Sequence, residues 1–382
     1  MPNSAIRVLV WGPGGLGNIC IREVVRLPEF ELSGVLAYAA NKNAADAGTL
    51  AGLAQPIGVR ATTSLEEAVA IDTDVVIHLA RDFGRYDSLP AIERFLAAGR
   101  NVISVHPFHH REVMAMTAAP DDTVARIDAA CAAGGSVFHA TGIHPEWVAN
   151  RMAPALTGIC TDVRNVTIYE NWDMSQFNAA TLSVIGFGKS PDAMEANPAV
   201  AQMTDNYCLQ NLYGLAAGLH VQLDHTTVHH DYAAAPADLE FASLSIASGT
   251  VGRLTHTWHG YRADETSPIV TAEVNWMLGR AEMVPPGMDP THYYGVRVEG
   301  TPSVSMGISI KGSVRDDTSL VDPDDPTSEP GYYGAVAACL QAIPRVLDAE
   351  PGWLAPVGPG LHWSPDLRTA HIARNNLAGS KG

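Results

Sequence analysis

Six residues near the start of the chain form a glycine-rich run suited to binding a dinucleotide. The run consists of Gly12, Pro13, Gly14, Gly15, Leu16 and Gly17. It follows the apolar segment 6–11 and precedes a helix-like segment, 18–25. Gly12 permits a tight turn, Gly14 lets the backbone approach a pyrophosphate, and Gly17 lets the helix pack closely on the strand. The helix N-terminus then offers N–H groups and a positive dipole end to the phosphates, so the strand, turn and helix together predict a dinucleotide site.

The end of the second expected strand bears on which dinucleotide binds. NAD-preferring sites usually carry Asp or Glu there, hydrogen-bonded to the ribose 2′-hydroxyl. In this chain segment 31–37 is followed by segment 38–43, and the first acid is Asp46. The missing carboxylate removes repulsion against a 2′-phosphate, and Lys42 beside Asn41 can pair with that phosphate. We therefore expect NADP as the cofactor, with NAD as the alternative; the other interpretation of Lys42 is an ordinary solvated lysine.

Two histidines follow expected strands of one sheet and are the leading acid/base candidates. In an open parallel sheet a ligand binds beyond the carboxyl ends of the strands. His106 and His144 each follow such a strand, as do Ala80 and Arg81, which we expect beside the cofactor. Histidine suits proton transfer because its ordinary pKa lies near neutrality. The alternative for each histidine is a hydrogen-bonded structural role.

Acids beside aromatic residues in two further segments predict a substrate pocket. Glu170 ends an expected strand and is a third catalytic candidate, because its carboxylate is suited to binding an amine. The pocket residues that we expect are Glu146, Trp147, Tyr169, Trp172 and Asp173. The alternative for the segment around Glu170 is a solvated strand end.

The histidines also raise the question of a metal site. His106, His109 and His110 have nearly helical ligand spacing. Pro107 disturbs a helix there, and no dense carboxylate pattern accompanies the group. We therefore expect no bound metal.

The first part of the chain alternates between strand and helix patterns. Short apolar runs at 74–80, 101–105 and 136–140 predict buried strands, and 90–98 and 122–133 predict helices. Such alternation predicts an α/β fold whose N-terminal domain is a Rossmann-type, doubly wound parallel sheet. We expect this domain to span residues 1–140.

The pattern changes after residue 140 and predicts a second, α+β domain over 141–334. A helix is expected at 145–156, and another at 335–347 within a C-terminal segment, 335–382, that returns to the first domain. The expected strands span 163–170, 241–247, 251–258, 269–277 and 293–298. The second and third of these flank Ser248, Gly249 and Thr250 and predict a hairpin. Consecutive strands of this kind indicate a mixed or antiparallel sheet.

Composition restricts the partners. The net charge is −17, from 24 Lys and Arg against 41 Asp and Glu, which disfavours nucleic acid and anionic membranes. The five cysteines are scattered, which fits reduced, buried thiols in a cytoplasmic protein. We expect no signal peptide and no membrane span, because the first apolar run is short and leads directly into the glycine turn, and no apolar stretch is long enough to span a bilayer. We expect a small-molecule substrate and a homodimer formed through the second domain's sheet.

Several segments together carry a family resemblance. They are Val10 to Gly17, Asp74 to His78, Asn101 to Ser104, Ala140 to Pro145, Ala155 to Gly158, Glu170 to Ser175, Gly186 to Pro191, Ala342 to Pro344 and Ala349 to Gly352. In these segments the chain resembles the dihydrodipicolinate-reductase-like superfamily, in the branch of diaminopentanoate dehydrogenase and the native amine dehydrogenases. The resemblance runs nearly end to end and implies a Rossmann-type, NAD(P)-dependent oxidoreductase.

One departure from that branch concerns the substrate. Amine dehydrogenases of the branch resemble one another in a glutamate shortly after the strand corresponding to 101–104, where this chain has 105–108 and then Glu112. Glu146 or Glu170 is expected to replace it. We expect hydride transfer between nicotinamide and a C=N or C=O carbon of a small, apolar ketone or amine. The alternatives are a carbonyl reductase with histidine as proton donor and a non-catalytic NADP-binding sensor.

Overall fold

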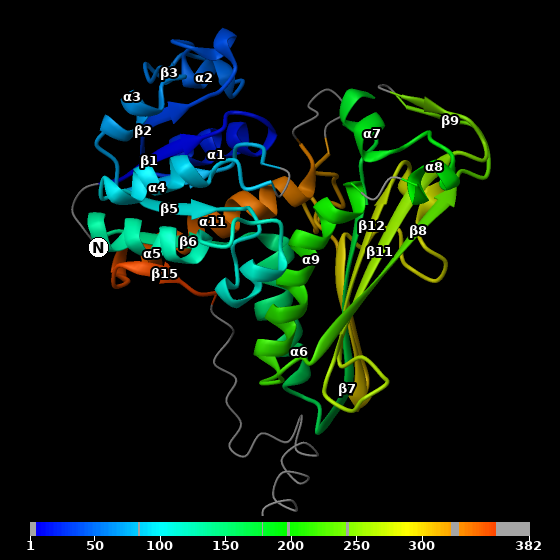
Figure 1. Ribbon diagram of the computed structural model, residues 1–382. Helices are drawn as coiled ribbons and strands as arrows, with labels where there is room; N and C mark the ends of the chain where they lie inside the picture. The colour runs from blue at the N-terminus through cyan, green and yellow to red at the C-terminus, as the bar shows by residue number, and fades with distance from the viewer. Residues whose placement is uncertain are drawn as a thin grey trace, which may run out of the picture. The chain divides into compact units, whose positions relative to one another are not determined.

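The computed structural model describes residues 5–82, 85–177, 179–196, 199–241, 244–321 and 328–356. These residues divide into two compact units (Figure 1). One unit contains the chain up to Ile143 together with Ser319–Pro356, and the other contains His144–Thr318. The C-terminal part of the chain therefore contributes to the N-terminal unit.

The first unit is built on a seven-stranded sheet in the order β15-β6-β5-β4-β1-β2-β3, in which every pairing is parallel. Its strands are β1 (Ile6–Trp11), β2 (Phe30–Leu36), β3 (Ala61–Thr62), β4 (Val75–His78), β5 (Asn101–Ser104), β6 (Val137–Ala140) and β15 (Gly352–Leu354). Its helices are α1 (Gly15–Arg26), α2 (Ala47–Leu50), α3 (Leu65–Ala70), α4 (Leu89–Ala97), α5 (Thr123–Gly134) and α11 (Pro330–Asp348), with 3₁₀ turns η1 (Ala40–Lys42) and η2 (Arg111–Met116). The expected parallel α/β sheet is confirmed.

Local sequence explains how these helices begin and end. The α3 helix starts where the Ser64 hydroxyl accepts from the Glu67 N–H, and α4 carries Pro90 in its first turn. The α5 helix stops because Gly135 has the left-handed φ of 63° that glycine adopts at no steric cost. The boundaries of α4 and α5 lie close to those expected from the sequence, whereas α3 was not predicted.

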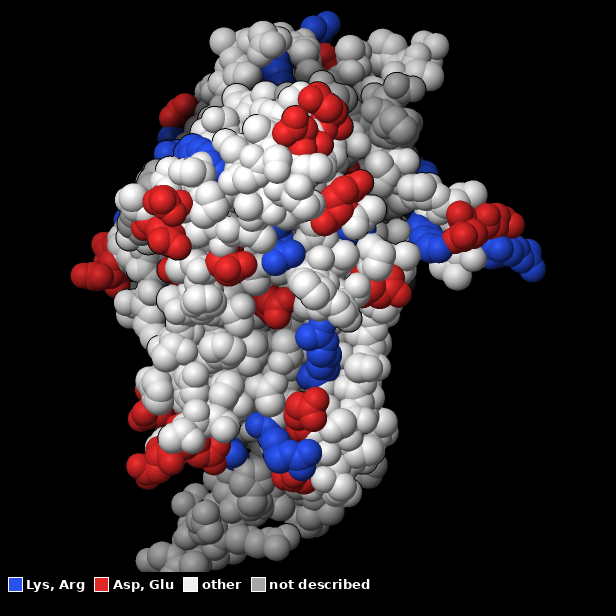
Figure 2. Space-filling model, turned by 90° about the vertical axis from the view of Figure 1, so that its right-hand side faces the viewer, with Lys and Arg blue, Asp and Glu red and all other residues white. Residues whose placement is uncertain are grey.

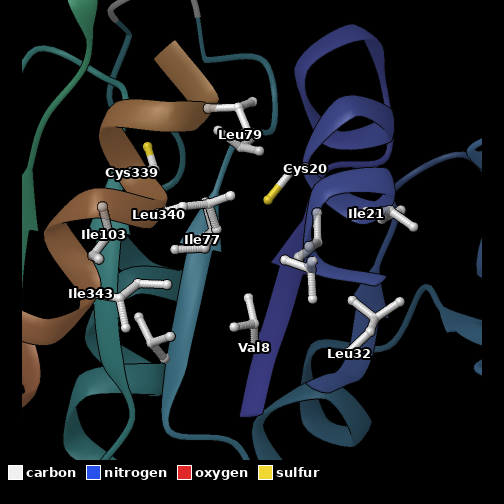
Figure 3. Close-up of a cluster of buried hydrophobic side chains, with 14 of the residues drawn as sticks. Val8, Cys20, Ile21, Leu32, Ile77, Leu79, Ile103, Cys339, Leu340 and Ile343 are labelled. Atoms are coloured by element: carbon white, nitrogen blue, oxygen red, sulfur yellow. The ribbon is translucent and has the colours of Figure 1, made fainter. Parts of the chain in front are cut away.

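Two apolar cores hold the helices against the sheet. One core joins α1 and α11 to the strands, and Figure 3 shows Ile343 of α11 beside Ile103 of β5 and Ile77 of β4. The other core joins α4 and α5 to the opposite side of the same strands. All five cysteines are free and buried, as expected. The sheet is thus covered on both faces, as parallel sheets require.

The second unit is built on a six-stranded sheet in the order β14-β13-β7-β12-β11-β8. The strands are β7 (Asp162–Asp173), β8 (His225–Ala234), β11 (Val251–Tyr261), β12 (Val270–Met277), β13 (Tyr294–Thr301) and β14 (Val304–Ile308). The helices are η3 (Ile143–Met152), α6 (Ala153–Thr157), α7 (Ala179–Ile185), α8 (Pro191–Glu195), α9 (Ala199–Gly218) and α10 (Arg280–Met283). Only the β7–β12 pairing is parallel, so the sheet is mixed, as expected. The α9 helix packs on β11 and β12 and covers one face.

The expected hairpin of 241–247 with 251–258 is wrong. The β11 strand pairs instead with β8, with Val251 opposite Ala234, and the chain between them carries a separate ribbon of β9 (Leu239–Glu240) and β10 (Ser245–Ile246). The Ala235 N–H donates to the Thr250 carbonyl and closes the longer β8–β11 connection. The β8 strand is rich in histidine and threonine and does not alternate apolar with polar residues, so its sequence does not predict a strand. Residues 242–243 lie outside the described part of the chain.

The expected helix at 145–156 begins later than predicted. His144, Pro145 and Glu146 have non-helical dihedral angles, and regular helical geometry follows only after them. A residue before proline is pushed into extended conformation, and His144 has φ −145° and ψ 107° accordingly. The irregular start holds His144 out of the helix.

The distribution of charged side chains on the surface agrees with the negative net charge. On the face shown in Figure 2, Lys and Arg side chains lie among Asp and Glu and do not gather into one basic patch. Among the described residues, no helix combines the length and apolar character needed to cross a membrane.

The packing of α11 predicts a stability difference within one helix. Ile343→Ala removes a side chain with no exposed surface and should lower the free energy of unfolding by about 2–5 kcal/mol. Leu347→Ala, in the same helix at a side chain that is 37% exposed, should cost about 1 kcal/mol or less. Urea unfolding of both variants measures the difference. Equal losses would show that α11 does not seal this core.

Candidate functional site

The glycine turn in the first unit is shaped by contacts that only glycine allows. Gly12 has φ +100°, and a Cβ on it would lie 2.4 Å from the Ala80 backbone. A Cβ on Gly17 would lie 2.0 Å from the Gly12 carbonyl oxygen. Gly14 differs, because nothing lies within 4 Å of the position its Cβ would take. The turn is therefore packed tightly on the protein side and open at Gly14.

The start of α1 leaves its first N–H groups available to a ligand. Gly14 is the N-cap and provides no side-chain cap, and the first turn contains no acidic residue. Pro13 is buried, and Leu16 packs against the core below the turn. A second contact comes from α11, since a Cβ on Gly15 would lie 2.6 Å from the ring of Tyr332. An open Gly14 beside an uncapped helix N-terminus fits a pyrophosphate.

The segment after β2 places a lysine at the same turn. Lys42, in η1, donates from Nζ to the Pro13 carbonyl oxygen, while Asn41 beside it is exposed. Asp46 does not serve as a ribose ligand here, because its carboxylate accepts from the N–H groups of Gly48 and Gly58, both at 2.8 Å. In the described segment after β2, an amine therefore lies at the glycine turn, and the first carboxylate is bound to backbone N–H groups.

His106 lies in the first unit and is engaged by the backbone. Its Nε2 lies 2.6 Å from the Ala80 carbonyl oxygen, and its ring centroid lies 4.7 Å from that of His78. Burial lowers the pKa of His106, and the charge of Asp82 only partly opposes this effect. His106 is therefore a neutral side chain that supports Ala80, the residue that contacts Gly12. Arg81 follows it at the surface.

The second unit holds a buried histidine–carboxylate pair. His144 Nδ1 lies 3.2 Å from Glu170 Oε2, and the two side chains are 3% and 10% exposed. The other carboxylate oxygen, Oε1, accepts from the indole N–H of Trp276 at 3.0 Å. Both oxygens of Glu170 are thus engaged by donors from two different segments, the loop before α6 and strand β12.

The contacts of His144 set the roles of its two nitrogens. A neutral imidazole carries one proton, and the carboxylate at Nδ1 favours the tautomer with that proton on Nδ1. The amide of Asn211, on α9, lies 3.4 Å from the same Nδ1. Since amide oxygen and nitrogen are nearly interchangeable in position, the Asn211 Oδ1 becomes a second acceptor when the amide is turned. Nε2 is buried and has no hydrogen-bond partner within the described parts of the chain.

Glu146, expected in the pocket, lies in a strained turn next to His144. Its backbone has φ 86° and ψ −74°, a conformation that costs a non-glycine residue about 1–3 kcal/mol. Its side chain is fully buried and accepts from Arg151 Nε at 3.2 Å. Trp147 follows and is half-buried. Glu146 is thus paired with Arg151, and the turn it makes sets the position of His144.

The three remaining pocket candidates on β7 do not share one face. Trp172 lies on the face of Glu170, with its ring 6.1 Å from that of Trp276. Tyr169 and Asp173 alternate onto the opposite face, where Arg297 lies 4.7 Å from the Tyr169 ring centroid. The Asp173 carboxylate accepts backbone N–H groups at Gly279 and Arg280 and so fixes the turn after β12. The structure brings Trp172 to Glu170 and turns the other two away from it.

Two residues of this site were missed from the sequence. Trp276 and Asn211 lie more than 100 and 60 residues from their partners Glu170 and His144, with separations of 106 and 67. The β7–β12 register, which pairs Trp276 with Trp172, is what brings the indole to the carboxylate. The strand pattern at 269–277 could have placed Trp276 on an expected strand, but not beside Glu170.

Within the described residues, no group of three or more His, Cys, Asp or Glu side chains is placed to hold a metal ion. The described residues include an open glycine turn in one unit and a buried histidine–carboxylate pair in the other. Residues that fit an NAD(P) cofactor are those of the glycine turn, with Lys42 beside it.

Comparisons with known proteins agree with this assignment. No protein-family model matches the chain. An amine dehydrogenase from Streptomyces virginiae is 26% identical over 359 residues, which cover 91% of this chain and 94% of that protein. The structure of an amine dehydrogenase from Mycobacterium smegmatis matches with a TM-score of 0.74 at 19% identity, over 95% of this chain and 99% of that one. GenD2 from gentamicin A biosynthesis, in complex with NAD, matches at a TM-score of 0.49 and 19% identity, over 92% and 89% of the two chains.

The first two matches carry the argument. The Mycobacterium smegmatis structure shows the fold, and the similarity to the Streptomyces virginiae protein supports an NAD(P)-dependent oxidoreductase. The narrower assignment to the dihydrodipicolinate-reductase-like branch stays a prediction.

Gly14→Ala should separate cofactor binding from folding. Gly14 has extended dihedral angles, φ −119° and ψ −151°, and open space at its Cβ, so the free energy of unfolding should change by about 1 kcal/mol or less. The added methyl group should instead meet the pyrophosphate and weaken cofactor binding about ten-fold or more. Gly17→Ala, whose Cβ overlaps the Gly12 carbonyl, should destabilise the fold itself. Calorimetric titration with NADPH and thermal unfolding measure both; unchanged binding in Gly14→Ala would contradict the assignment.

Proposed function

We propose that this chain is an NAD(P)-dependent amine dehydrogenase that reduces the C=N carbon formed from a small, apolar ketone or aldehyde and ammonia. The observation that carries the proposal is the buried contact of His144 with Glu170. Glu170 replaces the carboxylate that amine dehydrogenases of the related branch place after the strand corresponding to β5. The similarity to the Streptomyces virginiae amine dehydrogenase supports the same chemistry.

The pair is suited to hold and move one proton. With Nδ1–H donating to Glu170, the Nε2 of neutral His144 can accept a proton, and the adjacent carboxylate stabilises the imidazolium that results. Nε2–H then donates to the imine nitrogen as the carbon is reduced and takes the proton back in the reverse reaction. NAD(P)H, when bound, supplies the hydride.

The carboxylate favours the amine over the alcohol as product. Protonation of an imine creates a cation, and a negative charge on Glu170 stabilises that cation through the imidazole. Reduction of a carbonyl develops negative charge on oxygen, which a nearby carboxylate opposes. Trp172 and Trp147 are suited to line an apolar substrate site. We assign His106 no role in proton transfer, because its Nε2 is engaged by the Ala80 carbonyl oxygen.

The cofactor that we propose is NADPH. Support comes from Lys42, whose ammonium group lies at the Pro13 carbonyl, and from Asp46, whose carboxylate is occupied by backbone N–H groups. A lysine at this place can pair with a 2′-phosphate, and no carboxylate repels it.

The proposal predicts ammonia-dependent turnover that depends on Glu170. NADPH oxidation with a panel of small ketones and aldehydes should require ammonia. Glu170→Gln, which keeps the shape and removes the charge, should lower kcat about 100-fold, the usual worth of an acid/base group. Glu273→Gln is the matched control, because Glu273 lies on β12 of the same sheet but alternates onto the opposite face and bonds to Asn275.

Three results would contradict parts of the proposal. Turnover without ammonia would make the chain a carbonyl reductase. If His106→Ala loses turnover and His144→Ala does not, His106 and not His144 is the proton-transfer residue. NADPH binding with no turnover across the whole panel would favour a non-catalytic sensor.

If Lys42 binds the 2′-phosphate, its substitution should weaken the binding of NADPH and not that of NADH. Lys42→Ala should raise the KM for NADPH about ten-fold and leave the KM for NADH within about two-fold, because only NADPH carries the 2′-phosphate. Initial rates with each cofactor at saturating substrate measure the change. An equal rise for both cofactors would mean that Lys42 acts on the turn through Pro13 and not on the phosphate.

A further inference from the structure

We propose that Trp276 is a positioning residue, whose indole N–H fixes the Glu170 carboxylate so that its second oxygen meets His144. The inference rests on the proposed function, in which Glu170 and His144 transfer the proton. It assigns a role to a side chain from a different strand, one that bears no acid or base of its own.

The carboxylate has two donors with separate geometry. Trp276 Nε1 donates to Oε1 at 3.0 Å, and His144 Nδ1 lies 3.2 Å from Oε2. A glutamate side chain has three rotatable bonds, so one contact alone leaves the second oxygen free to turn away. With Oε1 held by the indole, rotation of the carboxylate breaks a hydrogen bond to a charged group and is therefore disfavoured.

The indole is itself held in place by its neighbours. The register of β12 with β7 pairs Trp276 with Trp172, and their rings meet edge to face at 6.1 Å and 81°. The ring of His256, on β11, lies 6.4 Å away at 84°. Edge-to-face contacts of this kind favour one ring orientation. The direction of the N–H toward Glu170 is therefore set by the sheet register.

Tryptophan suits this role because it donates and does not titrate. An indole N–H is a donor only and carries no charge. Lysine or arginine at the same place would pair with Glu170 and compete with His144 for its charge. Trp276 holds the carboxylate and leaves the negative charge to act on the imidazole.

Among the described residues, three titratable groups face Glu170. His144 contacts it directly, Cys208 of α9 interacts with it electrostatically, and Tyr294 of β13 lies opposite it in register. Burial raises the pKa of the Cys208 thiol well above its usual range, so Cys208 stays neutral. On the far side of the indole, burial lowers the pKa of His256 to about 3, so it is neutral as well. His144 is thus the titratable partner in direct contact with Glu170.

The chain offers a matched control on the same face of the sheet. Trp258, on β11, donates from Nε1 to Asp205 at 2.7 Å. Trp258→Phe therefore removes an indole–carboxylate hydrogen bond of the same kind, at a carboxylate that does not contact His144. Trp276→Phe removes the donor to Glu170 and keeps a smaller aromatic ring in place, and Trp258→Phe makes the same reduction in ring size.

The first measurement is independent of activity. In the full-length protein labelled with ¹⁵N-tryptophan, the indole resonance of Trp276, assigned by its loss in Trp276→Phe, should move when Glu170→Gln weakens the acceptor. The Trp258 resonance should not move. A Trp276 resonance that is unchanged in Glu170→Gln would overturn the proposed contact.

The second measurement tests positioning in turnover. Trp276→Phe should lower kcat about ten-fold with KM within two-fold, and the acid limb of its pH profile should move to higher pH, because the carboxylate loses a donor to its charged form. Trp258→Phe should keep the wild-type profile. Unchanged kinetics in Trp276→Phe beside a normal loss in Glu170→Gln would overturn the positioning role. If Glu170→Gln itself leaves turnover unchanged while the Trp276 resonance moves, the contact stands and the proposed function fails.

Discussion

The second unit depends on how one nearly buried carboxylate, that of Glu170, obtains hydrogen-bond donors in place of water. Glu170 lies on the face of the sheet that α9 covers, and a buried carboxylate is stable only when donors replace the water it has lost. Here the replacement comes from His144 in the irregular turn before α6 and from Trp276 on β12. The parallel pairing of β7 with β12 and the strained backbone at Glu146 both serve this arrangement, because each brings one donor to the carboxylate.

The first unit depends on a different constraint, which is the close approach of backbone to backbone. Gly12 must pass Ala80, and Gly17 must pass the Gly12 carbonyl, so any side chain at either place would open the turn. His106 stabilises this arrangement because its Nε2 contacts the Ala80 carbonyl oxygen. A histidine that follows a strand end can therefore act on a cofactor site by fixing the backbone, without touching the reacting atoms.

Local patterns in the sequence predicted most of the first unit. The glycine run and the alternation of apolar strands with helices depend on neighbouring residues, so the parallel sheet could be expected and is confirmed. The structure of the second unit was harder to predict from the sequence. The hairpin of 241–247 with 251–258 failed because β8, rich in histidine and threonine, took the place beside β11, and only the tertiary pairing reveals this.

The same limit applies to the candidate site. Glu170 and His144 could be selected by their chemistry and their place after strands, but Trp276 and Asn211 could not, because sheet register and helix packing bring them in. Alternation along β7 likewise separates Tyr169 from Glu170, although they are adjacent in sequence. Residue type thus selects the candidate side chains, and sheet register determines which of them lie together.

The measurement that tests this account most directly is the tautomer of His144, read from ¹⁵N chemical shifts of ring-labelled histidine in the full-length protein, with the resonance assigned by its loss in His144→Gln. The account predicts that at neutral pH the proton is on Nδ1, toward Glu170, and that Nε2 is unprotonated. A proton on Nε2, with Nδ1 bare, would show that Glu170 does not orient the imidazole and would contradict the pair as the proton-transfer group.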